Sequence, residues 1–124
     1  MNQYQLAEFF RDELHMKADI NVTKYLVNIP NYQKVIVDIV LKNETEIAIE
    51  HKELPDIGQI EKGIGQALIN LLIFPESWLS VPEKALELAI PILKKVNNRN
   101  FRIFDWDNIQ LHELRNGEVV AYKL

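Results

Sequence analysis

Three ionisable side chains that lie close together in the sequence, Asp38, Glu50 and Lys52, could act together in catalysis. Asp38 is the one acid in the apolar stretch 35–41, and Glu50 and Lys52 end the largely apolar stretch 46–52. Because side chains alternate across a strand, Glu50 and Lys52 would point to the same face. A carboxylate in an apolar run is costly unless a cation or hydrogen-bond donors compensate it. If a hairpin places Asp38 beside Glu50, two carboxylates and one ammonium converge.

Such a trio suits the hydrolysis of phosphodiester bonds. Two carboxylates offer hard oxygen ligands for Mg²⁺, which keeps its other positions for water and a phosphate oxygen. The metal would lower the pKa of its bound water and neutralise charge on the phosphoryl oxygens. The compact charge of Lys52 could hold the attacking water and stabilise the transition state. The residue types therefore predict a metal-dependent phosphodiester hydrolase.

The periodicity of apolar residues predicts the elements that would position this trio. The predicted helices cover residues 3–17, 57–74 and 83–97, and the predicted strands cover 25–29, 35–41, 46–52, 78–82, 101–114 and 118–124. The second and third strands form a hairpin, and the later strands join through helical crossovers. We therefore expect an α/β sandwich, with a mixed central sheet flanked by helices.

The composition is that of an ordinary globular protein. The chain of 124 residues is 48% hydrophobic and 26% charged, which predicts a single domain over residues 1–124. It contains no cysteine, and no window approaches 18 uninterrupted apolar residues, so we expect a cytoplasmic protein without a membrane span. The net charge of -4 argues against a broad basic surface that coats nucleic acid, but it leaves room for a local basic patch.

The pattern resembles that of the PD-(D/E)XK nuclease superfamily, in which an acid in one strand is followed by Glu-x-Lys at the end of the next. Here it reads V-D at 37–38 and E-H-K at 50–52. The predicted order over residues 3–82 resembles the restriction-endonuclease-like αβββαβ core, followed here by a C-terminal helix and strands. The stretch E-K-G-I-G-Q-A-L at 61–68 and the following W-L-S-V-P are similar to the helix and strand after the motif in many members. A looser likeness is to XisH-type and Holliday-junction-resolvase-like members.

The resemblance implies a role for each matching residue. Asp38 and Glu50 would bind Mg²⁺ or Mn²⁺, and Lys52 would assist the attacking water. The acid that the family carries in its first helix would be Glu8, with Glu13 as the alternative. On the helix after the motif, Gln66 and Lys62 would contact the substrate. Where many members have a proline before the first acid, this chain has a valine.

We expect a metal-dependent endonuclease that acts on DNA as a homodimer or with a partner protein, because a bare core offers little surface to grip a duplex. The alternative is a catalytically inactive nuclease-fold module for binding or assembly in a DNA-processing or mobile-element complex. A third interpretation takes the trio as accidental, since a Glu-x-Lys match arises about once by chance in a chain of this composition. It predicts that Asp38 and Glu50 lie far apart.

Other polar residues near the trio have simpler interpretations. His51 would point away from Glu50 and is expected to be a packed or hydrogen-bonded core histidine. Gln59 and Asn70, on the helix at 57–74, are expected to face water. Gly63 and Gly65 would let that helix pack closely on the sheet. Farther along the chain, Asp105 and Asp107 could form a second metal site, but a turn at the strand end is the favoured interpretation.

Overall fold

The element order of the sequence prediction is confirmed through the fifth strand. The computed structural model describes residues 1–26, 33–42 and 44–108. The helices are α1 (Gln3–Asp12), α2 (Ile57–Asn70) and α3 (Leu86–Val96), with short 3₁₀ turns η1 (Glu83–Ala85) and η2 (Trp106–Asn108). The strands are β1 (Lys17–Leu26), β2 (Gln33–Lys42), β3 (Glu46–His51), β4 (Glu76–Val81) and β5 (Phe101–Asp105). The strand predicted at 118–124 and residues 109–114 of the one predicted at 101–114 lie outside the described residues. The prediction was wrong for residues 106–108, because β5 ends at Asp105 and these residues form η2.

The five strands form one mixed sheet in the order β1-β2-β3-β4-β5. β1, β2 and β3 pair antiparallel as a meander. β4 pairs parallel to β3, and β5 pairs parallel to β4, each after a helical connection. β3 is therefore the strand at which the sheet changes from antiparallel to parallel pairing.

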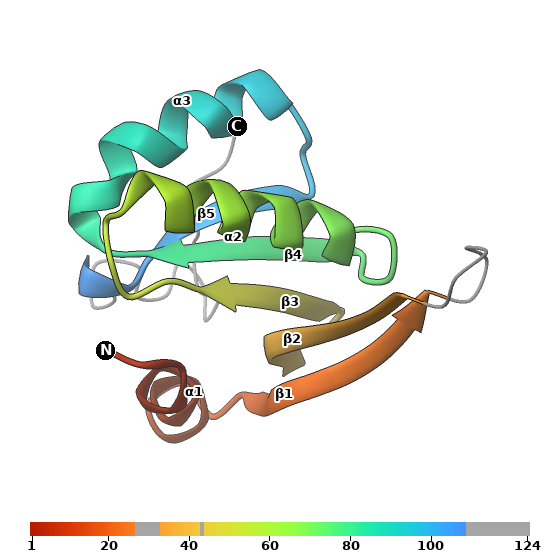
Figure 1. The fold of residues 1–124 in the computed structure, drawn as a ribbon. Helices are drawn as coiled ribbons and strands as arrows, with labels where there is room; N and C mark the ends of the chain where they lie inside the picture. The colour runs from red at the N-terminus through yellow and green to blue at the C-terminus, as the bar shows by residue number, and fades with distance from the viewer. Residues whose placement is uncertain (27–32, 43, 109–124) are drawn as a thin grey trace.

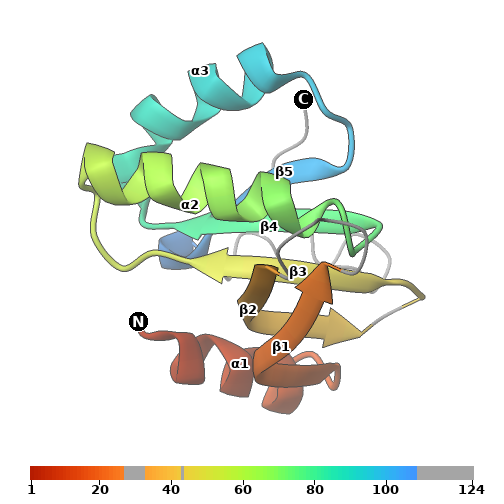
Figure 2. The same ribbon diagram turned by 45° about the vertical axis from the view of Figure 1, so that its right-hand side comes forward.

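Helices cover both faces of this sheet, which confirms the mixed α/β architecture. α1 lies on one face, and α2 and α3 lie on the other (Figure 1). Under α1 the core includes Leu6, Phe10, Ile39, Ile49 and Trp78. Under α2 and α3 a second cluster includes Ile60, Ile64, Leu79, Leu93 and Phe101. The turned view shows α2 running above β3 and β4 (Figure 2). Among the described residues no helix is both long and apolar enough to cross a membrane.

Several element boundaries differ from the sequence prediction, most clearly those of α1, β1 and α2. The first helix ends at Asp12 rather than 17, and the chain turns at His15, whose φ of 53° is left-handed, before β1 begins at Lys17. β1 is far longer than the strand predicted at 25–29, because it pairs with β2 along most of its length. α2 ends at Asn70 rather than 74, since β4 already begins at Glu76.

Candidate functional site

The hairpin of β2 and β3 opens into a fork beside the predicted acids. Its ladder runs from Lys42 opposite Glu46 to Ile39 opposite Ile49 and ends there. Beyond that point β2 pairs only with β1, and β3 pairs only with β4, within the described part of the chain. One step further in the same register places Asp38 opposite Glu50. The two carboxylates therefore meet where the strands diverge.

Asp38 spans this fork. Its Oδ2 accepts a hydrogen bond of 2.8 Å from the backbone N–H of His51. The side chain of Asp38 thus replaces the main-chain pairing that the divergence of the strands removes. A carboxylate that accepts a backbone hydrogen bond is held in one position. The carboxyl of Asp38 also forms a side-chain hydrogen bond with Glu50, so the two acids are in direct contact.

Glu50 is buried, with 2% of its surface exposed. Burial raises the pKa of its carboxyl from 4.5 to about 8, and the neighbouring negative charge of Asp38 adds to this rise. A hydrogen bond of 2.9 Å from Asn70 Nδ2 to Glu50 Oε1 and the charge of Lys52 act in the opposite direction. The acids that the third interpretation expected to lie far apart are therefore electrostatically coupled neighbours.

Asn70 is a site residue that the sequence analysis missed. It was expected to face water, but it is 0% exposed and its amide holds Glu50. A signal was available in the sequence, because Ile60, Gly63, Ala67 and Asn70 follow one another at spacings of three and four on the buried side of α2. A polar residue in such a stripe needs a buried partner.

Lys52 lies on the same face of the sheet as Glu50 and its main chain is fixed on both sides. Its N–H donates to the Ser80 carbonyl at 2.8 Å, and its carbonyl accepts from Trp106 Nε1 at 2.9 Å. The half-buried side chain lies against Gly63 of α2. It forms no salt bridge with any residue that the structure describes. Its ammonium group is therefore close enough to act on Glu50 while still available to a ligand.

Gly63 leaves the space that the Lys52 side chain occupies. A Cβ on Gly63 would lie 2.6 Å from Leu79 Cδ1 and 3.0 Å from Lys52 Cε, so the neighbours would have to move. A Cβ on Gly65 would meet nothing within 4 Å. The sequence prediction of close packing is thus confirmed for Gly63 and wrong for Gly65.

The two glycines give a matched pair of variants. Gly63→Ala is expected to displace Lys52 and to lower any Lys52-dependent activity about tenfold or more, because displacement of a catalytic group by about 1 Å can cost 10²-fold. Gly65→Ala is expected to keep full activity and to raise helix stability by up to about 1 kcal/mol. Cleavage rates and urea unfolding of both variants would test this. Equal activities would show that Leu79 and the flexible end of Lys52 give way to the added methyl group without loss of function.

Gln66, for which the sequence analysis predicted a contact with substrate, lies near Glu50. It lines a small pocket of about 150 Å³ together with Glu50 and Lys34. Its Oε1 is buried without a hydrogen-bond partner among the described residues, and the same holds for Oδ1 of Asn70. Buried amide oxygens usually have partners, so these two atoms can accept from a ligand or from metal-bound water. Lys62 is exposed on α2 and is not among the residues that line this pocket.

The acids predicted from the first helix do not join Asp38 and Glu50. Glu8 and Glu13 are exposed, and within the described ranges no three histidine or acidic side chains gather as a metal-binding group. The donor set that remains nevertheless suits a small hard cation, because its charge would offset the repulsion between Asp38 and Glu50. A magnesium ion keeps most of its ligand positions for water and phosphate oxygens, so two carboxylates suffice.

Two further sequence predictions concern residues near the site. His51 points to the α1 face, is 8% exposed and is hydrogen bonded through both ring nitrogens, to Ser80 Oγ at 2.9 Å and to the Met1 carbonyl at 2.7 Å. The predicted core histidine is therefore confirmed. Asp105 Oδ1 accepts from the backbone N–H groups of Asp107 and Asn108, which confirms a turn at the end of β5.

No protein-family model, no curated protein and no solved structure matches the chain. The function therefore has to be argued from the geometry of Asp38, Glu50 and Lys52 and from the pockets around them.

Proposed function

We propose that this protein is a Mg²⁺-dependent endonuclease that hydrolyses phosphodiester bonds in DNA, and that its α1-β1-β2-β3-α2-β4 segment is a restriction-endonuclease-like core. The observation that carries this proposal is the meeting of Asp38 and Glu50 at the fork of β2 and β3, with Lys52 on the face that Glu50 occupies. Mn²⁺ is expected to replace Mg²⁺. Two acids this close repel each other when both are ionised, so one of them keeps a proton until a cation takes its place, and a strongly raised pKa of this kind is typical of functional sites.

Each residue of the site has a distinct task in this proposal. The bound metal would supply a water of lowered pKa and would offset the charge that develops on the phosphoryl oxygens. Asp38 and Glu50 would hold it, each already oriented by a hydrogen bond, from the His51 N–H and from Asn70 respectively. Lys52 would orient the attacking water and stabilise the transition state through its charge. Gln66 would position a phosphate or its bound water.

Binding of DNA needs more surface than this site provides. The chain carries a net charge of -4, which opposes the approach of a duplex. Lys34, which lines the pocket beside Glu50, and Lys62 of α2 are both exposed and could contact phosphates. A homodimer or a partner protein would add the remaining contact surface, and we include such an assembly in the proposal.

One observation favours a second candidate, an inactive nuclease-fold module for binding or assembly in a DNA-processing complex. Glu50 is almost fully buried, and its raised pKa keeps it protonated at neutral pH until a cation displaces the proton. A protein that never binds the metal would keep a neutral Glu50. The two candidates therefore differ in whether metal and substrate reach this carboxyl.

Cleavage of a panel of DNA substrates tests the proposal. Labelled single strands, duplexes, flaps and four-way junctions would be incubated with Mg²⁺, Mn²⁺ or EDTA. Lys52→Ala is expected to lower the rate by about 10²–10³-fold, the usual effect of removing one group that stabilises the transition state. The control is Lys94→Ala, an exposed lysine on α3, far from the site in sequence.

Metal-dependent cleavage that survives in Lys94→Ala and is lost in Lys52→Ala would support the nuclease. Absence of cleavage with any substrate, by folded protein in either metal, would favour the inactive module. Cleavage that persists at the wild-type rate in Lys52→Ala would contradict the assigned site.

A further inference from the structure

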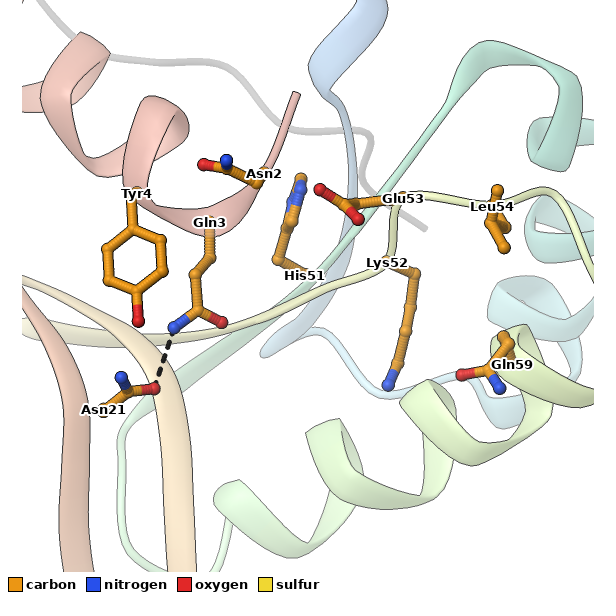
Figure 3. A pocket seen from close by; sticks show the side chains of 9 residues that line it. All are labelled: Asn2, Gln3, Tyr4, Asn21, His51, Lys52, Glu53, Leu54 and Gln59. Carbon is orange, nitrogen blue, oxygen red and sulfur yellow. Dashed lines mark hydrogen bonds between the residues drawn. The ribbon is translucent and has the colours of Figure 1, made fainter.

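A larger pocket lies on the other side of Lys52, at the mouth of the fork. Its volume is about 580 Å³, within the range of pockets that bind small organic groups. The start of α1, Asn21 of β1, the end of β3 and Gln59 of α2 surround it (Figure 3). Asn21 stands opposite Asp38 in the register of β1 and β2, between the pairs of Ile20 with Ile39 and Val22 with Val37.

This pocket adjoins the proposed catalytic site. His51 and Lys52 both line it, and the His51 N–H donates to Asp38. Figure 3 shows the Lys52 side chain extending away from Glu53 and toward Gln59. A group bound here would therefore sit next to whatever Asp38 and Lys52 hold.

The lining favours a ligand that is neutral and rich in hydrogen-bonding groups. It contains four carboxamides, those of Asn2, Gln3, Asn21 and Gln59, but only one lysine and one glutamate, whose charges cancel. Gln3 Nε2 donates to Asn21 Oδ1 at 2.8 Å, which leaves the other half of each amide for a ligand. Phosphate sites usually carry an excess of cations. A nucleobase, which has donors and acceptors on one edge, fits this lining better.

Two exposed side chains with apolar surface lie on opposite sides of the pocket (Figure 3). Tyr4 is 56% exposed and Leu54 is 63% exposed, and both line the pocket. Tyr4 belongs to the first turn of α1 and is held by a helix that is capped at Asn2. Exposed aromatic rings beside polar groups are the arrangement that proteins use to stack unpaired bases.

We propose that this pocket binds the base of an unpaired nucleotide next to the phosphate that is cleaved. This inference rests on the proposed nuclease function and names its substrate class. Bases inside a duplex are stacked and paired, so they cannot enter a pocket unless they are extruded or already single-stranded. The substrate is therefore DNA with at least one unpaired nucleotide at the cleavage position, as in a single strand, a flap or a bulge.

Binding measured without cleavage tests this inference. Fluorescence anisotropy in EDTA would compare a labelled single strand, the matched duplex and a duplex with one bulged nucleotide. Wild type is expected to bind the single strand and the bulge about tenfold more tightly than the duplex. Tyr4→Ala is expected to lose about tenfold for the single strand, whereas Tyr4→Phe keeps the ring and the affinity. The control Tyr25→Ala removes a tyrosine of similar exposure, 54%, from β1 outside the pocket.

Equal affinities for single strand and duplex would overturn the inference, and so would a loss in Tyr4→Ala no larger than in Tyr25→Ala. Failure of the proposed function looks different. If binding depends on Tyr4 but no substrate is cleaved with metal, the base-binding pocket is supported and the proposed nuclease activity is contradicted. If cleavage requires Lys52 but the affinity is unchanged in Tyr4→Ala, the nuclease activity is supported and the base-binding pocket is contradicted.

Discussion

Glu50→Gln is expected to stabilise the metal-free protein at alkaline pH and to abolish cleavage. The pKa of Glu50 is raised from 4.5 to about 8 by burial and by Asp38, so between these pH values the folded chain holds a proton that the unfolded chain releases. The free energy of unfolding of the wild type should therefore fall as pH rises from about 4.5 to about 8, and level off above this window. The glutamine is neutral at every pH and can still accept the hydrogen bond from Asn70.

Urea unfolding at pH 5, 7 and 9 in EDTA measures this difference. The wild type is expected to lose a few kcal/mol more than Glu50→Gln between pH 5 and pH 9. Glu61→Gln, which changes an exposed glutamate of α2, should keep the wild-type dependence on pH. Loss of a hydrogen-bond partner of a metal ligand typically lowers activity by about 10–100-fold. Glu50→Gln removes a proposed ligand itself, so its cleavage rate is expected to fall by more than this. Parallel pH profiles for wild type and Glu50→Gln would contradict the raised pKa of the buried Glu50 carboxyl.

Asp38→Asn is expected to remove cleavage while leaving the fork intact. The asparagine side-chain oxygen can still accept from the His51 N–H, but the negative charge that a cation requires is gone. Loss of that charge also removes one cause of the raised pKa of Glu50, so the pKa of Glu50 should fall. The decrease in stability between pH 5 and pH 9 should then be shallower than in the wild type.

Asp38→Ala separates the structural role of this side chain from its chemical role. It leaves the His51 N–H without its partner at a half-buried position, at a cost of about 1–3 kcal/mol relative to Asp38→Asn. Both variants should lose cleavage equally. The measurements are urea unfolding in EDTA and cleavage of the best substrate. Residual activity in Asp38→Asn near the wild-type level would exclude Asp38 as a metal ligand.

The parts of the site that follow from local rules were predictable from the sequence. Alternation along β3 correctly separated Glu50 and Lys52 from His51, because residues on one strand point to opposite faces in turn. The hairpin of β2 and β3 could be predicted from two apolar, β-branched stretches around a short polar turn. The meeting of Asp38 with Glu50 depended only on the register of that hairpin.

The parts that depend on contacts distant in sequence were not predictable. β1 is an exception, because residues 18–23 alternate apolar and polar side chains, a pattern that predicts a half-buried strand and that the sequence analysis missed. The partner of Asn70 is Glu50, and the sequence alone does not show that the two side chains meet. The bond from Trp106 to the Lys52 carbonyl joins residues 54 positions apart, which no local pattern indicates.

The divergence of β2 from β3 also affects how the small pocket beside Glu50 responds to mutation. Residues 33–37 of β2 pair with β1 on one edge, and within the described part of the chain no strand pairs with the other edge, which borders the pocket beside Glu50. Part of the wall of this pocket is therefore main chain whose N–H and C=O groups pair with no described strand on that edge and could contact a ligand. Substitution of a side chain leaves such groups in place. If the pocket binds a ligand as proposed, substitutions of Lys34, Val35 or Ile36 would change which ligand is preferred, whereas contacts made by the main chain would remain.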